Sequence, residues 1–244
     1  MPEITEDCVS RAWLKAIRLA DACPRKEVPN LVVNIEGITE AGGLEDAIIR
    51  EAFDQALEAN GNFSVSTVAN TIFPVSLWRQ NLPRRVLFER YLKLWPRINK
   101  VRSNRRGTYF QRLISYPDSS DSSLNQLEFV ISAYRGGTRR RSALQCGILA
   151  PPLDLNATPF QGFPCMQQVA FLPETGNGLR VAALYPMQYL WARAYGNYLG
   201  LINLGRFMAI EMGLELRAMT CIALVAKLDR PDLAAPFMEA ASEI

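Results

Sequence analysis

Four segments of the chain place apolar residues every three or four positions, which is the spacing of an amphipathic helix: 10–21, 44–59, 124–134 and 195–212. In the first, Trp13, Ile17 and Ala20 share one face, and in the second Ile48, Ala52 and Leu57 form the expected buried face. The last segment is the longest, and Gly213 follows it as the expected residue after the C-cap. Three glycines inside this segment lower its helix propensity, so we expect close packing against another element to compensate.

Strands are predicted mainly in the second half, where apolar runs are short and bounded by proline or glycine: 142–149, 166–172, 179–185 and 219–226. The sequence Gly176-Asn177-Gly178 between the second and third runs predicts a hairpin turn. Most predicted helices precede the strands, and one long helix lies inside the strand region. This order favours an α+β fold over a doubly wound parallel sheet, and residues 1–244 are expected to form a single domain.

The amino-acid composition indicates only a globular protein, but it excludes several kinds of catalytic site. The chain is 49% hydrophobic and 21% charged, which is typical of a globular protein. It contains no histidine, so Ser-His and Cys-His dyads, HExxH zinc helices and imidazole bases are excluded. Any reaction must therefore use cysteine, carboxylates, lysine, arginine, tyrosine, asparagine or bound water.

The cysteine spacing and the N-terminal residues indicate the cellular compartment in which the protein is expected. The five cysteines are widely spaced and include no CxxC pair, which excludes zinc-ribbon and thioredoxin-like sites. The N-terminal residues 1–7 are acidic and lack the apolar core of a signal peptide. We expect a cytoplasmic protein with reduced thiols and no membrane association.

Charge is distributed unevenly along the chain. Seven acidic residues and one base lie in 36–58, whereas eleven bases and one acid lie in 79–112, and the bases continue at Arg135 and 139–141. A solvated helix face is the usual explanation of such a run, and an anion-binding site is the alternative. Nucleic acid is disfavoured as a partner because the net charge of the whole chain is only +3.

Cys165 is the strongest candidate nucleophile. It follows Pro164 directly before a predicted strand, so its thiol is expected to be held rigidly. A small buried hydrophobic side chain is the alternative role of a single cysteine. Without histidine, the pKa of this thiol could be lowered only by arginine, lysine or a helix N-terminus.

An arginine triplet and three further residues are candidates for binding. Consecutive arginines at 139–141 lead into a predicted strand, so we expect one to point toward the core, where a phosphate would match its guanidinium fork. Asn197 is either a helix cap, the commoner role, or an amide that recognises a ligand. Tyr109 and Trp78 could stack on a planar substrate, and core packing explains both equally well.

Several motifs occur in the order found in the thymidylate synthase superfamily. Residues 125–131 followed by 136–141 resemble its "NQL..VI…RR" segment, and 162–165 resemble its "PPCH" nucleophile loop. Leu184-Tyr185, with Asn197 twelve residues later, resembles its "LYQRS.D…G.PFN" segment, and 107–109 resemble its "G..Y". The similarity spans residues 68–229 and rests on order and spacing more than on any single motif.

The resemblance implies a thymidylate synthase-like mixed sheet packed with helices, in a homodimer whose subunits meet sheet to sheet. It implies methyl or hydroxymethyl transfer to C5 of a pyrimidine nucleotide, nucleoside or related base. The one-carbon donor would be 5,10-methylenetetrahydrofolate, and a covalent cysteine adduct at C6 would make C5 nucleophilic.

The resemblance assigns several of the family's roles to residues of this chain. The catalytic group would be Cys165 as nucleophile, Asn197 reading the pyrimidine edge and Tyr109 lining the cofactor side. Arg140 and Arg141 would bind the phosphate of the neighbouring subunit's nucleotide. The remaining substrate residues would be Arg193 and Gln188, and Trp78 would lie on the folate side.

The chain departs from the family pattern at important positions. Met166 replaces the histidine after the nucleophile, Met187 stands where the family has its phosphate-binding arginine, and residues 227–229 replace the later "H.Y". Arg193 is the expected substitute for the missing arginine. Two alternatives therefore stay open: a non-catalytic nucleotide-binding or partner subunit, and a folate-independent cysteine enzyme acting on another planar substrate.

Overall fold

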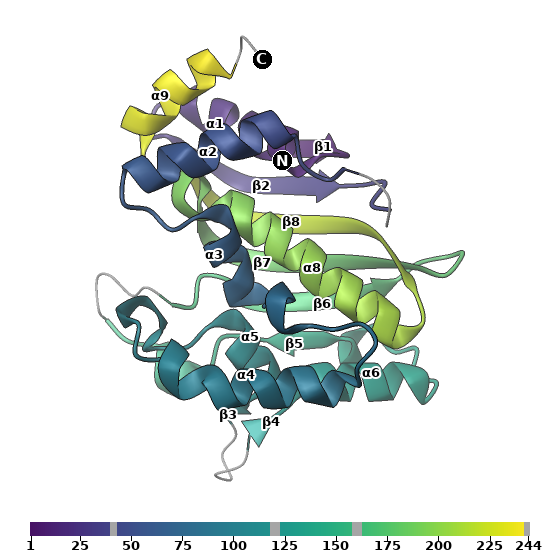
Figure 1. The fold of residues 1–244 in the computed structure, drawn as a ribbon. Helices are drawn as coiled ribbons and strands as arrows, with labels where there is room; N and C mark the ends of the chain where they lie inside the picture. The colour runs from purple at the N-terminus through teal and green to yellow at the C-terminus, as the bar shows by residue number, and fades with distance from the viewer. Residues whose placement is uncertain (40–42, 118–122, 158–162, 242–244) are drawn as a thin grey trace.

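A mixed six-stranded sheet forms the centre of the computed structural model, which describes residues 1–39, 43–117, 123–157 and 163–241 (Figure 1). The strand order is β1-β2-β8-β7-β6-β5. The pairs β1–β2 and β7–β8 are parallel, and the other pairs are antiparallel. The strands are β1 (Glu3–Glu6), β2 (Glu27–Ile35), β5 (Gln145–Gly147), β6 (Gln168–Pro173), β7 (Gly178–Tyr189) and β8 (Glu215–Lys227), and β3 (Tyr116–Pro117) and β4 (Ser123–Leu124) form a separate ribbon.

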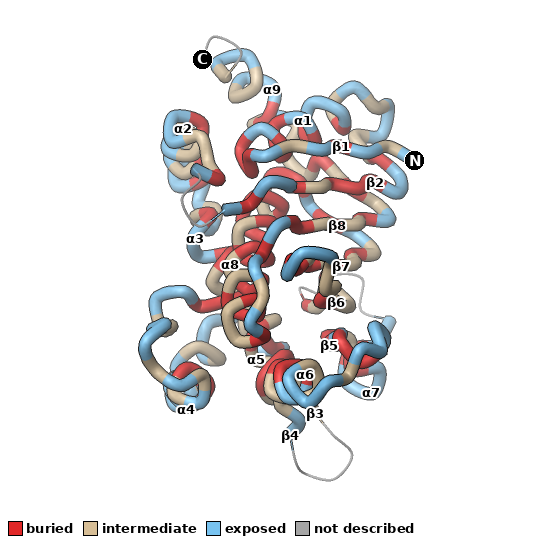
Figure 2. The backbone as a smooth tube through the Cα atoms, turned by 90° about the vertical axis from the view of Figure 1, so that its right-hand side faces the viewer, coloured by how far each residue is buried: buried red, intermediate tan, exposed pale blue. Residues whose placement is uncertain are grey.

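The helices gather on one side of the central strands. Figure 2 shows α2, α3 and α8 on the same side of β8 and β7. A short π-helical turn, Leu190–Ala194, leads from β7 into α8. The helices are α1 (Val9–Asp21), α2 (Ala47–Ala59), α3 (Val65–Ile72), α4 (Arg84–Ile98), α5 (Tyr109–Ile114), α6 (Gln126–Arg135), α7 (Pro151–Asp154), α8 (Tyr195–Met212) and α9 (Pro231–Ala240). The fold is α+β with a mixed sheet packed against helices, as predicted.

The two faces of the sheet differ in burial. On β7, Val181 and Ala183 point into the core, and on β8 Cys221 does the same. On the opposite face Ile222 is only half-buried, and Leu224 keeps 45% of its surface exposed. Side chains alternate between the faces of a strand, so this second, partly apolar face lies away from the helices.

The predicted helices and the hairpin are confirmed, with changes at their ends. Residues 195–212 form α8, and Gly213 follows it in the left-handed conformation (φ 72°). The hairpin joins β6 and β7, with positive φ at Gly176 and Asn177. The predicted face of 44–59 was right at Leu57 and wrong at Ile48 and Ala52, since α2 begins at Ala47 and buries Ile49, Phe53 and Leu57 while Ile48 is 60% exposed.

The first two strands were not predicted, so the expectation that strands follow the helices was incomplete. β2 contains Pro29 and Asn30, the latter with a positive φ of 53°, and its pattern lacks clear alternation. It nevertheless pairs with β8 from Glu27 to Ile35, and β1 pairs with residues 32–35 on its other side. The predicted strand 142–149 is also shorter, because Arg141–Ala143 form a 3-10 turn before β5.

Glycines let α8 approach α3 closely, as the sequence led us to expect. A Cβ atom at Gly200 would lie 2.8 Å from the backbone oxygen of Ala69 and 2.9 Å from Cβ of Ile72. A Cβ atom at Gly196 would lie 2.5 Å from Cβ of Val68. Both contacts are too short for a real side chain, so these two glycines set the distance between the helices.

We therefore expect Gly200→Ala to destabilise the protein by about 1–3 kcal/mol, because the added methyl group meets backbone that cannot move aside. The gain in helix propensity, about 1 kcal/mol, offsets only part of this cost. Urea unfolding measures the change. Gly147→Ala is the control, since a Cβ there has no neighbour within 4 Å. Equal unfolding midpoints for the two variants would contradict the packing argument.

Candidate active site at Cys165

Cys165 lies in the short segment that enters β6, and its side chain is half-buried while those of Cys8, Cys146 and Cys221 are buried. All five cysteines are free thiols. Burial raises the pKa of the Cys165 thiol, and the positive charge of Arg193 opposes this shift. Cys165 thus combines a partly accessible thiol with a nearby cation, Arg193. Gly162, which belongs to the same motif, lies outside the described residues.

Tyr109 lies next to Cys165. It is the first residue of α5, whose N-terminus is capped by Thr108 through a 3.2 Å hydrogen bond from the Gln111 amide. The Tyr109 hydroxyl accepts a 3.4 Å hydrogen bond from the amide of Met166, and its ring packs 5.2 Å from the ring of Phe163. Burial and the neighbouring Cys165 raise the pKa of Tyr109, so its hydroxyl stays protonated at neutral pH.

Arg193 reaches this region from the π-helical turn before α8. Its guanidinium lies 5.3 Å from the ring centroid of Phe63. The turn is held by the half-buried Asp229, whose carboxylate accepts hydrogen bonds from the amides of Trp191 (2.9 Å) and Ala192 (3.3 Å). Burial raises the pKa of Asp229, and these hydrogen bonds and Arg193 lower it. Asp229 therefore positions the turn that carries the only cation identified beside Cys165 among the described residues.

Asn197 is the third residue of α8 and is 4% exposed, so its interpretation as a helix cap was wrong. Ala194 occupies the cap position and makes no side-chain capping bond. On α8, Asn197 lies on the same side of the helix as Leu201, Leu204 and Met208. The adjacent residue, Tyr198, faces the sheet. Within the described residues its amide has no hydrogen-bond partner. A buried amide without partners is suited to bind a ligand.

Gln188 lies deeper in the core. It is 1% exposed, donates a 3.4 Å hydrogen bond to Sγ of Cys221, and accepts one of 3.4 Å from the hydroxyl of Tyr198. This amide is engaged in holding β7, β8 and α8 together. The structure thus places Gln188 behind the candidate site, among core side chains.

Arg140 and Arg141 are both exposed, and the expectation that one of the arginines at 139–141 points into the core was wrong. The reason is the 3-10 turn at Arg141–Ala143, which places these arginines outside the strand. Arg140 lines a surface hollow of about 430 Å³ together with Phe129, Gln145 and Gln168. This hollow lies over β5 and β6, beside the sheet face that carries Ile222 and Leu224.

Trp78 is half-buried and packs edge-on against Phe73 (5.6 Å between centroids) and Phe207 (5.9 Å). Phe207 is ten residues beyond Asn197 on α8, a distance of about 15 Å along the helix axis. Trp78 was predicted either to stack on a planar substrate or to pack against the core. The structure shows packing against the core and does not bring Trp78 beside Cys165.

The sequence analysis missed a buried ion pair beneath the nucleophile segment. The side chains of Arg112 and Asp154 are only 4% and 3% exposed and form two hydrogen bonds, of 3.0 and 3.1 Å. Arg112 also lies 5.4 Å from the ring centroid of Phe163, and Asp154 accepts a 2.7 Å hydrogen bond from the Ala150 amide. Arg112 looked like one base in a surface run, and no local signal marks it as buried.

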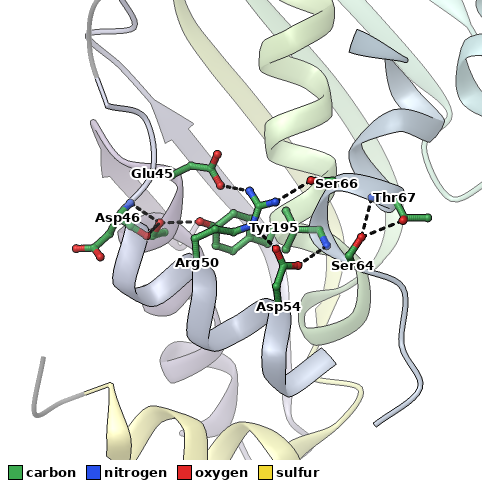
Figure 3. Close-up of polar contacts among 10 residues, drawn as sticks. Glu45, Asp46, Arg50, Asp54, Ser64, Ser66, Thr67 and Tyr195 are labelled. Carbon is green, nitrogen blue, oxygen red and sulfur yellow. Dashed lines mark hydrogen bonds and ion pairs between the residues drawn. The ribbon is translucent and has the colours of Figure 1, made fainter. Parts of the chain in front are cut away.

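A second polar network joins α2, α3 and α8 away from the thiol (Figure 3). Arg50 binds Glu45, Asp54 and Ser66, and its guanidinium lies 5.9 Å from the ring of Tyr195. The Tyr195 hydroxyl is hydrogen-bonded to Ser10 at 2.7 Å. These hydrogen bonds tie Tyr195, the first residue of α8, to the helices beside it, so we assign the network a structural role in fixing the start of α8.

Comparison with models of known protein families gives no match, and no curated protein is significantly similar to the chain. In the ranges that the structure describes, no group of three or more cysteine or acidic side chains is arranged to hold a metal ion. None of the helices described is long and apolar enough to cross a membrane.

Proposed function

We propose that this protein is a thymidylate synthase-like enzyme that modifies C5 of a pyrimidine nucleotide or related base through a covalent bond to Cys165. The observation that carries the proposal is the convergence of Cys165, Tyr109 and Arg193 at the entrance of β6. These residues come from three distant parts of the sequence. The free amide of Asn197 at the start of α8 adds a group suited to a heterocycle edge.

The chemistry follows from the thiol. The Cys165 thiolate forms a bond to C6 of the pyrimidine, and the electron pair of the C5–C6 double bond moves onto C5 and the adjacent carbonyl. C5 then attacks a one-carbon electrophile, and loss of the C5 proton allows the sulfur to leave with its bonding pair. A thiolate suits both steps, since it is a good nucleophile and a good leaving group.

The surrounding residues support this reaction without histidine. Burial raises the pKa of the Cys165 thiol, and the positive charge of Arg193 opposes this rise and so favours the nucleophilic thiolate. The protonated hydroxyl of Tyr109 is a donor for a polar atom of the bound base. Asn197 can donate and accept at once, as the edge of a pyrimidine requires.

The packing of Trp78 does not fit the folate-side role that the resemblance implied. The ring of Trp78 is packed against Phe73 and Phe207 and does not offer a free face beside Cys165. We therefore derive no step that involves methylenetetrahydrofolate. The proposal covers the activation of the base, and the experiment below also tests the one-carbon donor.

The test is covalent trapping with 5-fluoropyrimidine nucleotides, with and without methylenetetrahydrofolate. We expect an adduct on Cys165 detected by intact-protein and peptide mass spectrometry, because fluorine blocks the loss of the C5 substituent. An adduct that requires the folate supports one-carbon transfer, and one that forms without it supports a folate-independent cysteine enzyme. Absence of any adduct, together with no thermal shift, would reject the reaction and favour a non-catalytic subunit.

The uncovered face of the sheet supports the second part of the proposal, a homodimer that meets sheet to sheet. Leu184 and Ile222 are half-buried there and Leu224 is 45% exposed. A second copy covers this face, and a two-fold axis makes the contact self-complementary. Arg140, in its hollow beside the same face, would then lie near the partner subunit.

We expect Leu224→Glu to convert the dimer to a monomer, because it buries a charge at the centre of an apolar contact. Native mass spectrometry and light scattering measure the change. Ile48→Glu is the control: Ile48 is 60% exposed on α2, on the other side of the sheet, so this variant should remain dimeric. A wild-type protein that is monomeric at micromolar concentration would reject the interface.

A further inference from the structure

Tyr185 carries a buried hydroxyl group that has no hydrogen-bond partner among the described residues. It lies on the core-facing side of β7, in register with Ala223 of β8, and is 0% exposed. Its hydroxyl makes no hydrogen bond to any residue that the structure describes. A buried hydroxyl without a hydrogen bond destabilises the folded protein. We therefore expect another group to become a hydrogen-bond acceptor for Tyr185 in another state of the protein.

The segment that carries Cys165 runs beside Tyr185, since the amide of Gln167 donates a 2.9 Å hydrogen bond to the carbonyl of Leu184. Burial raises the pKa of Tyr185, and the nearby ionisable groups Tyr109, Cys221, Cys165 and Tyr198 raise it further. Three of these four are already engaged: Tyr109 with the Met166 amide, and Cys221 and Tyr198 with Gln188. Of these four groups, the thiol of Cys165 is the one that, like the Tyr185 hydroxyl, makes no hydrogen bond to a residue that the structure describes.

We infer that Tyr185 donates a hydrogen bond to the sulfur of Cys165 when the thiol ionises. A neutral thiol is a weak acceptor, whereas a thiolate accepts a strong, charge-assisted bond. The hydroxyl keeps its proton throughout, so no proton is transferred and the only change is the new hydrogen bond. Tyr185 and Arg193 together then stabilise the thiolate in a protein without histidine.

This inference deepens the proposed function and rests on it only in treating Cys165 as a thiolate nucleophile. Its test therefore uses the thiol alone, without substrate or folate. The rate of alkylation of Cys165 by iodoacetamide is followed against pH by peptide mass spectrometry, in the wild type and in two variants. Tyr185→Phe removes the unpartnered hydroxyl, and Tyr198→Phe removes a hydroxyl that is equally buried but bonded to Gln188.

For Tyr185→Phe we expect the pH midpoint of alkylation to rise by about one unit and the rate at neutral pH to fall about tenfold, since the thiolate loses a charge-assisted bond. Its thermal midpoint should equal or exceed that of wild type, because no native hydrogen bond is lost. Tyr198→Phe should show the reverse: an unchanged alkylation profile and a thermal midpoint lower by a few degrees.

Two results would overturn the inference. One is a wild-type alkylation profile in Tyr185→Phe. The other is an equal shift in both variants, which would show a general loosening of the core and no specific bond to sulfur. If the alkylation shift appears but 5-fluoropyrimidine nucleotides form no adduct, the proposed function fails while the role of Tyr185 stands.

Discussion

Replacing Cys165 with alanine is expected to abolish adduct formation and to reduce turnover by about 10³-fold or more, because no other group in the site can form the bond to carbon. The thiol is half-buried and makes no hydrogen bond among the described residues, so the variant should unfold at nearly the wild-type urea concentration. Trapping with 5-fluoropyrimidine nucleotides and urea unfolding measure the two effects on the same samples.

Cys221→Ala is the matched control for that experiment. Burial raises the pKa of Cys221 to about 12, so its thiol is not ionised at neutral pH, and it is hydrogen-bonded to Gln188. This variant should therefore lose stability, by about 1–2 kcal/mol, while retaining the adduct on Cys165. Loss of the adduct in Cys221→Ala, with full retention in Cys165→Ala, would show that the nucleophile has been assigned wrongly.

Removing the buried guanidinium with Arg112→Ala should produce the largest loss of stability, about 3–5 kcal/mol. The substitution leaves the carboxylate of Asp154 buried without its cation and removes the side chain that packs against Phe163. Because Phe163 is two residues from Cys165, we also expect a weaker reaction of the thiol in the protein that remains folded. Urea unfolding and alkylation kinetics measure the two effects.

Two further variants test whether the ion pair itself is responsible. Arg84→Ala removes a partly exposed pair with Glu128 and Glu211 and should cost only about 1 kcal/mol. Replacing the buried pair by Arg112→Met with Asp154→Leu should recover much of the stability lost in Arg112→Ala, since no charge is left unpaired. If the double variant is no more stable than the single one, the loss comes from shape and not from the buried charge.

The amino-acid sequence by itself determined the elements whose signals are local. The stripe of α8 and the left-handed Gly213 after it, the Gly176-Asn177 turn and the α+β class follow from spacing and turn chemistry within a few residues. The sequence also indicated Cys165, because a proline before a strand is visible locally. The face of α2 was misjudged by one residue, since Ile48 and Ile49 are equally apolar and only their neighbours in space distinguish them.

Only the tertiary structure decided the features that depend on distant partners. β2 is a strand because β1 and β8 supply its hydrogen bonds, and the half-buried Trp78 packs against the core because Phe73 and Phe207 lie beside it. Arg112 differs from the exposed bases around it only through Asp154, forty-two residues later. The missing partner of Tyr185 is likewise invisible in sequence. Burial and pairing are properties of the folded chain. Arginines that lie close together in the sequence can therefore be either buried in an ion pair or exposed to solvent.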